Sequence, residues 1–535
     1  MKRFIYLMCI ALLFPIFSCK KFLDTSPLDF KTPENYFSTE SELNTALVGV
    51  YNKLQDERLY RRGLFTYLAI SDEFFYRNVS TSSLFVLDFD AAQVDVGRFW
   101  EACYQGVDRA NAILENIQKP VMDEQKRGVI KGETLFLRAY FYFLLVDNYG
   151  GVPLKLTSTK SPTEKPLKRA TVKEVYDQIL LDMTTAYALV QDIKKDPADQ
   201  TDAGLTYSER VTKSAIAGIL AKVCLTMAGE PLRDQTKSAE ALKWSELVIN
   251  SGRHMLNPDY KQIFINAAKD IYDTKECIWE IGFYGNNTGN AQQGGTLGIT
   301  NGITSTDLVD PGYATGTINA TGRMYNLYDA TDARRDWCIA PFKYVTANNK
   351  TTTVAWTAAQ IYDRNIGKWR RQYETVMPKT KDFNSVDFPA LRYSDVLLMY
   401  AEAANEVNGG PTSTAELYLN QVRRRGHNKP VGAADPVVDV TSGLGKSKFL
   451  EELQNERARE FAFEGMRQHD LKRWGLYVSK MNSLAVEINA SAPSTWKYAA
   501  SAGKNATDRN LLFPIPNSEL VLNPNIGVNN QNPGW

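Results

Sequence analysis

Carboxylate side chains recur at helical spacing in one segment near the end of the chain, residues 455–475. Glu456, Glu460 and Glu464 fall on one stripe of a helix, where residues three and four apart face each other. Paired carboxylates can act as acid and base in glycoside hydrolysis when they flank a sugar at a defined separation. The segment therefore has to be judged as a hydrolytic site or as a structural one.

Arginines in the same segment favour the structural interpretation. Arg457 and Arg467 lie close to these carboxylates and would lower a carboxyl pKa, whereas a general acid needs a raised one. Phe461 and Phe463 are interleaved with the charges, so part of the charge must lie against packed apolar surface, where it has to be paired. We predict no catalytic residue and a buried ionic clamp formed by Glu456, Arg457, Glu460, Glu464 and Arg467.

The remaining signals for chemistry are weak. The run Gly443–Ser447 resembles the end of a phosphate-binding loop, but Val440 stands where that motif needs a glycine. The three histidines are far apart and no cysteines have zinc-ligand spacing, so we expect no metal and no cofactor. Cys277 and Cys338 could meet, but the sequence alone does not pair them. A net charge of +1 argues against nucleic acid as a partner.

The N-terminus has the features of an export signal. Lys2 and Arg3 precede an apolar stretch at 4–16 that is too short to span a bilayer. It ends at Ser18-Cys19, which resembles a bacterial lipobox: cleavage after Ser18 would leave Cys19 to carry lipid. Acyl chains on Cys19 would hold the protein at a membrane. The alternative is an ordinary secretory signal with an incidental cysteine.

Hydrophobic periodicity predicts a mainly α-helical body. Thr39 and Glu42 have capping-box spacing at the start of one helix, and Trp100 is expected to anchor the core from the next helix. Residues 134–147 are apolar nearly all round, which is typical of a helix buried on most sides. Three further helices are expected between 171 and 252, and 215–229 with 239–250 resemble a tetratricopeptide hairpin.

This pattern predicts one domain that is built from several distinct parts. After a signal peptide at 1–18, we predict a single body over 19–535, because no Pro/Ser-rich linker interrupts it. Its helical scaffold covers about 36–254 and 391–480. An insertion of loops and short strand-like runs covers about 255–390, and an irregular tail covers about 481–535. Long loops in a compact body tend to be functional, so the insertion is the expected ligand face.

Five stretches together resemble the SusD/RagB family of nutrient-binding outer-membrane lipoproteins of gut-type Bacteroidetes. They are "CKKFLDTSPLDF", "LRAYFYFLLVDNYGGVPL", "RYSDVLLMYAEAANE", "ERAREFAFEGMRQHDLKRWG" and "LFPIPNSELVLNPNIGVNNQNPGW". They occur in the family's order from Cys19 to Trp535. The resemblance implies tetratricopeptide-like helix pairs, with loops and small strands on one side. It also implies a lid-like role over a SusC-like TonB-dependent transporter, which imports the captured ligand.

One feature departs from that family pattern. Lys20 and Lys21 follow Cys19, where an acidic run often marks surface display. Lipid anchoring follows from Cys19 itself, whereas location in the outer membrane, facing the cell exterior, follows from the resemblance.

The ligand contacts have to be predicted from chemistry, because the motifs that the family shares are scaffold. Sugars present C–H faces and many hydroxyls, so their binders use exposed aromatic planes with polar side chains beside them. The loop before Trp100 and the insertion both offer such residues, although ordinary packing is the alternative for each one alone. The candidates are Tyr76, Arg77, Phe85, Tyr284, Asn286, Asn287, Tyr313 and Trp356.

The sequence thus predicts a lipid-anchored, non-catalytic protein that binds oligosaccharide or polysaccharide and delivers it to a transporter. Two alternatives stay open: a peptide ligand, as in the RagB branch, and a carbohydrate hydrolase with unrecognised carboxylates.

Overall fold

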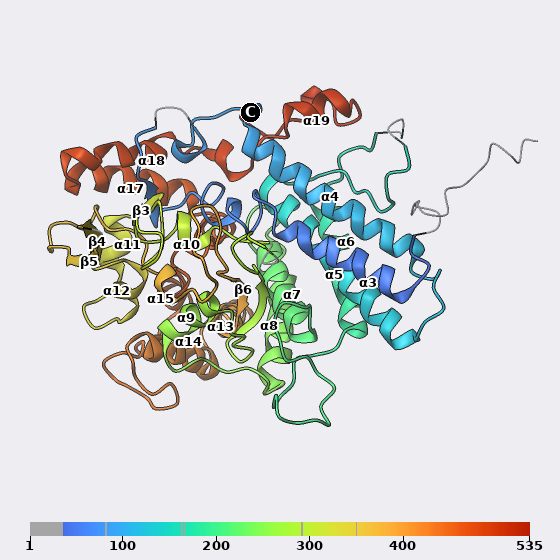
Figure 1. Cartoon of the computed structure of the whole chain (residues 1–535), viewed down its shortest axis with the longest axis horizontal. Coiled ribbons are helices and arrows are strands. Elements are labelled where there is room, and N and C mark those ends of the chain that lie inside the picture. The colour runs from blue at the N-terminus through green and yellow to red at the C-terminus, as the bar shows by residue number, and fades with distance from the viewer. Residues whose placement is uncertain (1–35, 81–82, 162–163, 165, 290–292, 349) are drawn as a thin grey trace, which may run out of the picture.

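A computed structural model describes residues 36–80, 83–161, 164, 166–289, 293–348 and 350–535. Helices dominate these residues and no sheet among them exceeds two strands, so the mainly α-helical fold class is confirmed. The signal peptide and Cys19 lie outside the described residues. The longer helices, labelled as in Figure 1, are α3 (Glu40–Leu54), α4 (Val94–Asn116), α5 (Glu124–Tyr149), α6 (Val172–Leu189), α7 (Lys213–Ala228), α8 (Thr236–Asn250), α9 (Tyr260–Lys269), α13 (Tyr393–Val407), α14 (Ser413–Gly426), α15 (Lys446–Glu460) and α17 (Tyr477–Ser491).

The helical scaffold is a chain of helices that contact one another in turn. Helices α3 to α8 pack consecutively, α8 packs on α13, and α13 packs on α14 and α15. Figure 1 shows α3 to α6 stacked side by side on the right of the molecule. The predicted capping box is confirmed: the Thr39 hydroxyl accepts from the Glu42 N–H, and the Glu42 carboxylate accepts from the Thr39 N–H.

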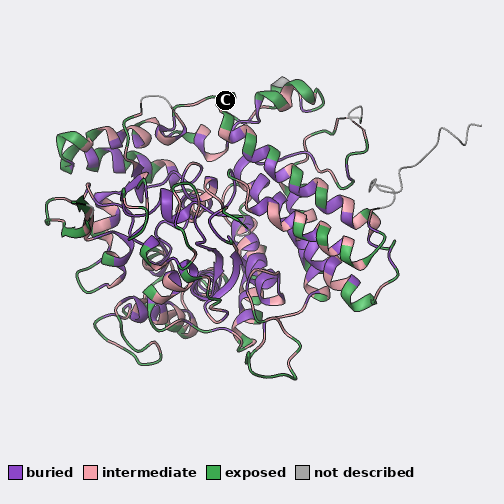
Figure 2. Ribbon diagram, in the orientation of Figure 1, coloured by how far each residue is buried: buried purple, intermediate pink, exposed green. Residues whose placement is uncertain are grey.

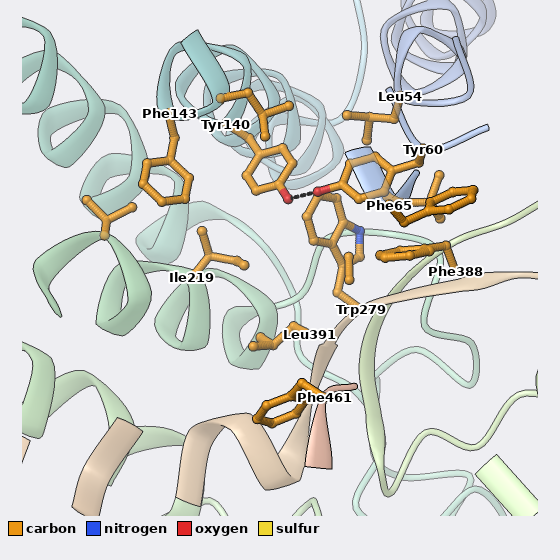
Figure 3. Packing of buried hydrophobic residues seen from close by; sticks show 14 of the residues in the cluster. Leu54, Tyr60, Phe65, Tyr140, Phe143, Ile219, Trp279, Phe388, Leu391 and Phe461 are labelled. Atoms are coloured by element: carbon orange, nitrogen blue, oxygen red, sulfur yellow. Dashed lines mark hydrogen bonds between the residues drawn. The ribbon is translucent and has the colours of Figure 1, made fainter. Parts of the chain in front are cut away.

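Helix α5 lies at the centre of the scaffold, as its all-round apolar sequence predicts. Nearly every residue from Ile130 to Tyr149 is buried, and Trp100 of α4 is buried as expected. Tyr140 hydrogen-bonds the hydroxyl of Tyr60 and packs edge-on against Trp279 at 4.8 Å between ring centres. Figure 3 shows these rings meeting Phe388 from the other half of the molecule. One apolar core therefore joins the scaffold to the insertion.

The strands form three antiparallel pairs, all within or against the insertion. Strand β1 (Phe74–Tyr76) pairs with β3 (Ile318–Ala320), and β2 (Cys277–Ile281) pairs with β6 (Phe388–Arg392). Strands β4 (Phe342–Ala347) and β5 (Lys350–Ala355) form a hairpin that is largely exposed at the edge of the molecule (Figure 2). Short helices connect these pairs: α10 (Leu297–Thr300), α11 (Gly322–Leu327) and α12 (Arg334–Cys338).

The insertion is more ordered and more buried than its sequence indicates. It opens with α9, a regular helix whose apolar residues Tyr260, Ile263 and Phe264 pack into the core. The loop segment 293–302 of the insertion also reaches the interior, because Asn301 is fully buried and its side chain bonds Thr66 at 2.9 Å. The expectation that the helical pattern ceases over 255–390 is therefore wrong, and only the exposed parts of this stretch stay candidates for the ligand face.

The C-terminal part is likewise not irregular throughout. Helix α17 continues to Ser491, and the shorter α18 (Ser501–Asn505) and α19 (Asn517–Leu522) follow. In Figure 1 these segments run along the upper edge of the molecule, over the scaffold and the insertion. Phe513 and Ile515, which lie between α18 and α19 in the sequence, are buried, so this part of the chain is packed onto the body.

The described residues contain no helix that is both apolar enough and long enough to cross a bilayer. Cys277 and Cys338 do not form a disulfide. Both are free and buried, and the Sγ of Cys338 lies 3.5 Å from the hydroxyl of Tyr260.

Candidate functional site

The charged segment after α14 forms a network of buried ion pairs. Glu460 accepts from Arg392 and Arg425 at 2.6 Å each, and from Arg334 at 3.0 Å. Glu464 accepts from Lys368 at 2.7 Å. These partners come from α12, β6, α14 and residue 368, so the network ties the insertion to the scaffold. The side chains are at most 2% exposed.

The other members of the predicted clamp extend the network. Glu456 accepts from Arg334 at 2.7 Å. Arg457 donates to Asp395 and Asp470 at 2.8 Å each, and Arg467 donates to Asp72 at 2.8 Å. Most partners are therefore distant in sequence, and pairing runs mainly between elements.

Electrostatics make these carboxylates poor general acids. Burial by itself would raise the pKa of Glu456, but the guanidiniums of Arg334, Arg459 and Arg423 lower it to about 2. The pKa of Glu460 is also lowered, by Arg425, Arg392 and Arg334, against the same effect of burial. Both groups stay ionised at neutral pH and have no proton to give a glycosidic oxygen.

The three glutamates do not share one helix, contrary to the sequence interpretation. Helix α15 ends at Glu460, and Phe463 and Gly465 follow in left-handed conformation with φ of 63° and 75°. Glu464 therefore lies in a turn before the short helix α16 (Arg467–Arg473). The buried carboxyl group of Glu73 holds this turn by accepting from the Phe463 N–H at 3.3 Å.

Aromatic side chains form a partly exposed stack near the start of the chain. The Tyr76 ring lies parallel to that of Phe85, with 3.9 Å between ring centres. Phe85 meets Tyr67 edge-on at 5.0 Å, and the Arg62 guanidinium lies 4.3 Å from the centre of the Tyr67 ring. All four side chains are of intermediate exposure. The hollow beside Tyr76 and Phe85 has a volume of only about 20 Å³, so a ligand would have to lie across the partly exposed stack rather than inside a cavity.

Arg77 joins this stack to the insertion. Its guanidinium donates to the hydroxyl of Thr304 at 2.5 Å, and its carbonyl accepts from the Tyr498 hydroxyl. Ser305 and Ala314 pair as an isolated bridge beside this contact. The structure thus brings together Tyr76, Arg77 and Phe85 with the 304–315 loop.

The candidates at 284–287 differ in accessibility. Tyr284 is 61% exposed. Asn286 is buried and donates to the Pro378 carbonyl, and Asn287 accepts from the Gly294 N–H at 2.5 Å. The prediction that both amides face a ligand is wrong for Asn286 and unsupported for Asn287, because these side chains hold their own loop in shape.

Tyr313 and Trp356 lie on neighbouring parts of the insertion. The Tyr313 carbonyl accepts from Arg371 at 2.6 Å, and the Lys381 ammonium lies 5.8 Å from the centre of its ring. Trp356 follows β5, and its ring centre lies 4.7 Å from the Lys343 ammonium. Both aromatic side chains are partly exposed. Each is therefore an aromatic plane with a cation beside it.

Several residues of this face were missed from the sequence. Tyr67 and Arg62 lie between α3 and α4, in a segment without periodicity. Trp496 and Tyr498 lie in the C-terminal part and reach the face because Phe75 packs against both rings, at 5.5 and 6.4 Å. The sequence feature that could have identified these residues is the clustering of aromatic residues in segments outside helices. We call the combined surface, formed by the stack, the 304–315 loop, β4–β5 and segment 370–383, the loop face.

Comparison with known proteins supports the resemblance found in the sequence. The profile described as "SusD family" matches residues 275–535, and the profile described as "Starch-binding associating with outer membrane" matches residues 21–225. SusD-like protein P2 of Formosa agariphila is 27% identical, over 98% of this chain and 98% of that protein.

Solved structures share the fold. A SusD homolog from Bacteroides thetaiotaomicron superposes with a TM-score of 0.85 at 29% identity, covering 94% of this chain and 98% of the other. Surface glycan-binding protein A from Bacteroides fluxus gives a TM-score of 0.71 at 21% identity, covering 93% and 100%, which shows the fold alone. The chain belongs to the SusD/RagB family.

Proposed function

We propose that this protein is a non-catalytic binding protein that captures an oligosaccharide or polysaccharide and delivers it to a SusC-like TonB-dependent transporter of the outer membrane. The observation that carries the proposal is the partly exposed aromatic stack of Tyr67, Phe85 and Tyr76 on the loop face. Aromatic planes stack on the C–H faces of sugars, and a ligand that lies across them can be a long chain. The family description, starch-binding and associating with the outer membrane, supports the same ligand class.

Binding and catalysis are separated by incubating the purified mature protein with polysaccharides such as amylopectin and laminarin. We expect slower migration of the protein in gels that contain the ligand, with the glycan recovered at its original length. Shortened products would identify a hydrolase. Absence of retardation, together with a peptide that co-purifies with the transporter complex, would favour the peptide alternative.

The loop face is tested by replacing Tyr313 and Trp356 together with alanine. Because both side chains are partly exposed, we expect weaker glycan retention with a nearly unchanged melting temperature. The matched control replaces Tyr400 and Tyr418, a partly exposed aromatic pair on α13 and α14 with 5.0 Å between ring centres. Equal weakening in both variants would refute this location of the site.

Lipid anchoring through Cys19 is part of the proposal. Acylation would retain the mature protein in the membrane fraction, and Cys19→Ala should release it. A mature N-terminus without added acyl mass, measured by mass spectrometry, would contradict the anchor. Co-purification of the wild-type protein with a β-barrel transporter tests the partner.

A further inference from the structure

Cations surround the aromatic residues on one part of the loop face. We define the cationic rim as Lys343, Arg370, Lys379 and Lys381. Among the residues that the structure describes, none of these four side chains has a carboxylate oxygen within 4.0 Å of its nitrogen atoms. Several buried arginines elsewhere, such as Arg334, Arg392 and Arg457, contact carboxylates directly. The rim is therefore a group of cations without a carboxylate in direct contact.

Each outer member of the rim lies over an aromatic ring. The Lys343 ammonium is 4.7 Å from the centre of the Trp356 ring, and the Lys381 ammonium is 5.8 Å from that of Tyr313. The Arg370 guanidinium is 4.0 Å from the centre of the Trp337 ring. The negative face of each ring attracts the cation and holds it beside the ring.

The inner member, Lys379, is buried without a counter-ion. Its side chain belongs to a residue only 8% exposed, and its ammonium donates to the Pro311 carbonyl at 3.1 Å. An ammonium has three donors, and no second hydrogen bond forms with any described residue. Burial lowers the pKa of Lys379, although Glu374 and Asp310 favour its charged form. Burying a cation in this way is costly unless an anion arrives.

Three carboxylates, those of Glu374, Asp307 and Asp310, lie near Lys379 without contacting its ammonium. Glu374 accepts from Arg371 at 2.7 and 2.8 Å, and Asp307 accepts from Thr351 at 2.6 Å. Asp310 is exposed and adds one negative charge to the area. Asp307 and Asp382, which follows Lys381, add two more, so the four rim cations exceed these three carboxylates by one.

The rim is held in place by the backbone that carries it. Arg371 donates to the carbonyls of Tyr313 and Thr380, at 2.6 and 2.7 Å, and so joins the segments on either side of Lys379. The Tyr344 hydroxyl donates to Gln372 at 2.6 Å, which attaches the β4–β5 hairpin to the same segment. Fixed cations need little reorganisation when they meet an anion.

We propose, resting on the proposed function, that the glycan bound at the loop face is anionic and carries carboxylate or sulfate ester groups. A ring beside a cation suits a sugar whose C–H face stacks while its acidic substituent pairs with the cation. The aromatic stack differs in this respect, because Arg62 lies 3.5 Å from a carboxylate oxygen of Glu57. The charged part of the ligand is thus assigned to the rim.

The test compares glycans that differ only in charge. Polygalacturonate is paired with its fully methyl-esterified form, and a sulfated carrageenan with its desulfated form, in affinity gels with the mature protein. We expect the charged glycan of at least one pair to be retained about tenfold more strongly than its neutral counterpart. The two pairs distinguish carboxylate from sulfate. Raising NaCl from about 50 mM to about 500 mM should weaken this retention.

Variants locate the effect. Lys343→Gln with Lys381→Gln should reduce retention of the charged glycan about tenfold without changing the melting temperature. The control, Lys173→Gln with Lys448→Gln, removes the same charge from exposed positions on α6 and α15 and should change nothing.

The outcomes separate the two proposals. Equal retention of charged and neutral glycans, or an unaffected rim variant, would overturn the anionic ligand and leave glycan binding standing. Equal retention of a double-stranded DNA would show attraction to any polyanion and would also overturn it. Retention of none of these glycans nor of amylopectin or laminarin would overturn glycan binding itself.

Discussion

Single residues in the ionic network depend on partners from several elements. Glu460 alone contacts Arg392, Arg425 and Arg334. In a buried network each charge is tolerated because its partners are present, and removal of one partner leaves another charge uncompensated. The stability lost on substitution therefore depends on the charged partner that stays buried without its counter-charge.

Arg457→Ala tests this dependence. The substitution leaves the buried carboxylates of Asp395 and Asp470 without this partner, and we expect the free energy of unfolding to fall by about 3–5 kcal/mol. Urea denaturation measures it. Lys173→Ala, which removes an exposed pair with Asp177, should change stability by less than about 1 kcal/mol. Similar small losses in both variants would mean that the network is accessible to water.

At the scale of elements, contact between α4 and α5 depends on a missing side chain. A Cβ added at Gly106 of α4 would lie 2.4 Å from the Phe141 ring of α5, which is fully buried. The two helices can approach this closely because position 106 has no side chain. In contrast, a Cβ added at Gly49 of α3 meets nothing within 4 Å.

These two glycines form a matched pair of alanine substitutions. Gly106→Ala should lower the free energy of unfolding by about 1–2 kcal/mol, because overpacking outweighs the gain in helix propensity. In Gly49→Ala the higher helix propensity of alanine acts alone, so the free energy of unfolding should rise by up to about 1 kcal/mol. Thermal unfolding followed by circular dichroism distinguishes them. Stabilisation by both substitutions would show that α4 and α5 can separate without cost.

At the scale of the whole molecule, buried acids make stability depend on pH. Burial raises the pKa of Glu280 to about 7, although a hydrogen bond from Ser208 favours its ionised form. Burial also raises the pKa of Glu73 to about 8. These carboxyl groups hold a proton in the folded state at pH values where the unfolded chain, with a pKa near 4.5, has released it.

The sign of the effect follows from this difference. Below about pH 4.5 Glu280 is protonated in both the folded and the unfolded state, so it does not lower the free energy of unfolding. As pH rises from 4.5 to about 7 the unfolded chain releases its proton first, so the free energy of unfolding falls by roughly 3 kcal/mol. Glu280→Gln should remove this part of the decline.

Urea unfolding at pH 5 and pH 8 measures the decline in wild type and variant. The control is Glu451→Gln, at an exposed position where Lys448 lowers the carboxyl pKa, so that it titrates below this window. An unchanged decline in Glu280→Gln would mean that Glu280 is ionised in the folded protein at neutral pH.

Local sequence patterns predicted the regular elements because their causes are local. The Thr39–Glu42 capping box and the all-round apolar run in α5 fix helices through interactions within a few residues. Helix α9 was missed although Tyr260, Ile263 and Phe264 have helical spacing, because the segment is short and lies among strand-like runs. The break after Glu460 was missed because left-handed Phe463 is held by Glu73, far away in the chain.

The sequence by itself determined the helical class of the fold, the family and the presence of a paired charge cluster, since periodicity, motif order and residue type are properties of the chain. Only the tertiary structure decided which charges pair and which stay uncompensated, because Glu460 and Lys379 find their surroundings through folding. It also decided that Asn286 is buried whereas Tyr67 joins the aromatic stack. Exposure is set by what packs against a residue, and that packing comes from segments hundreds of positions away.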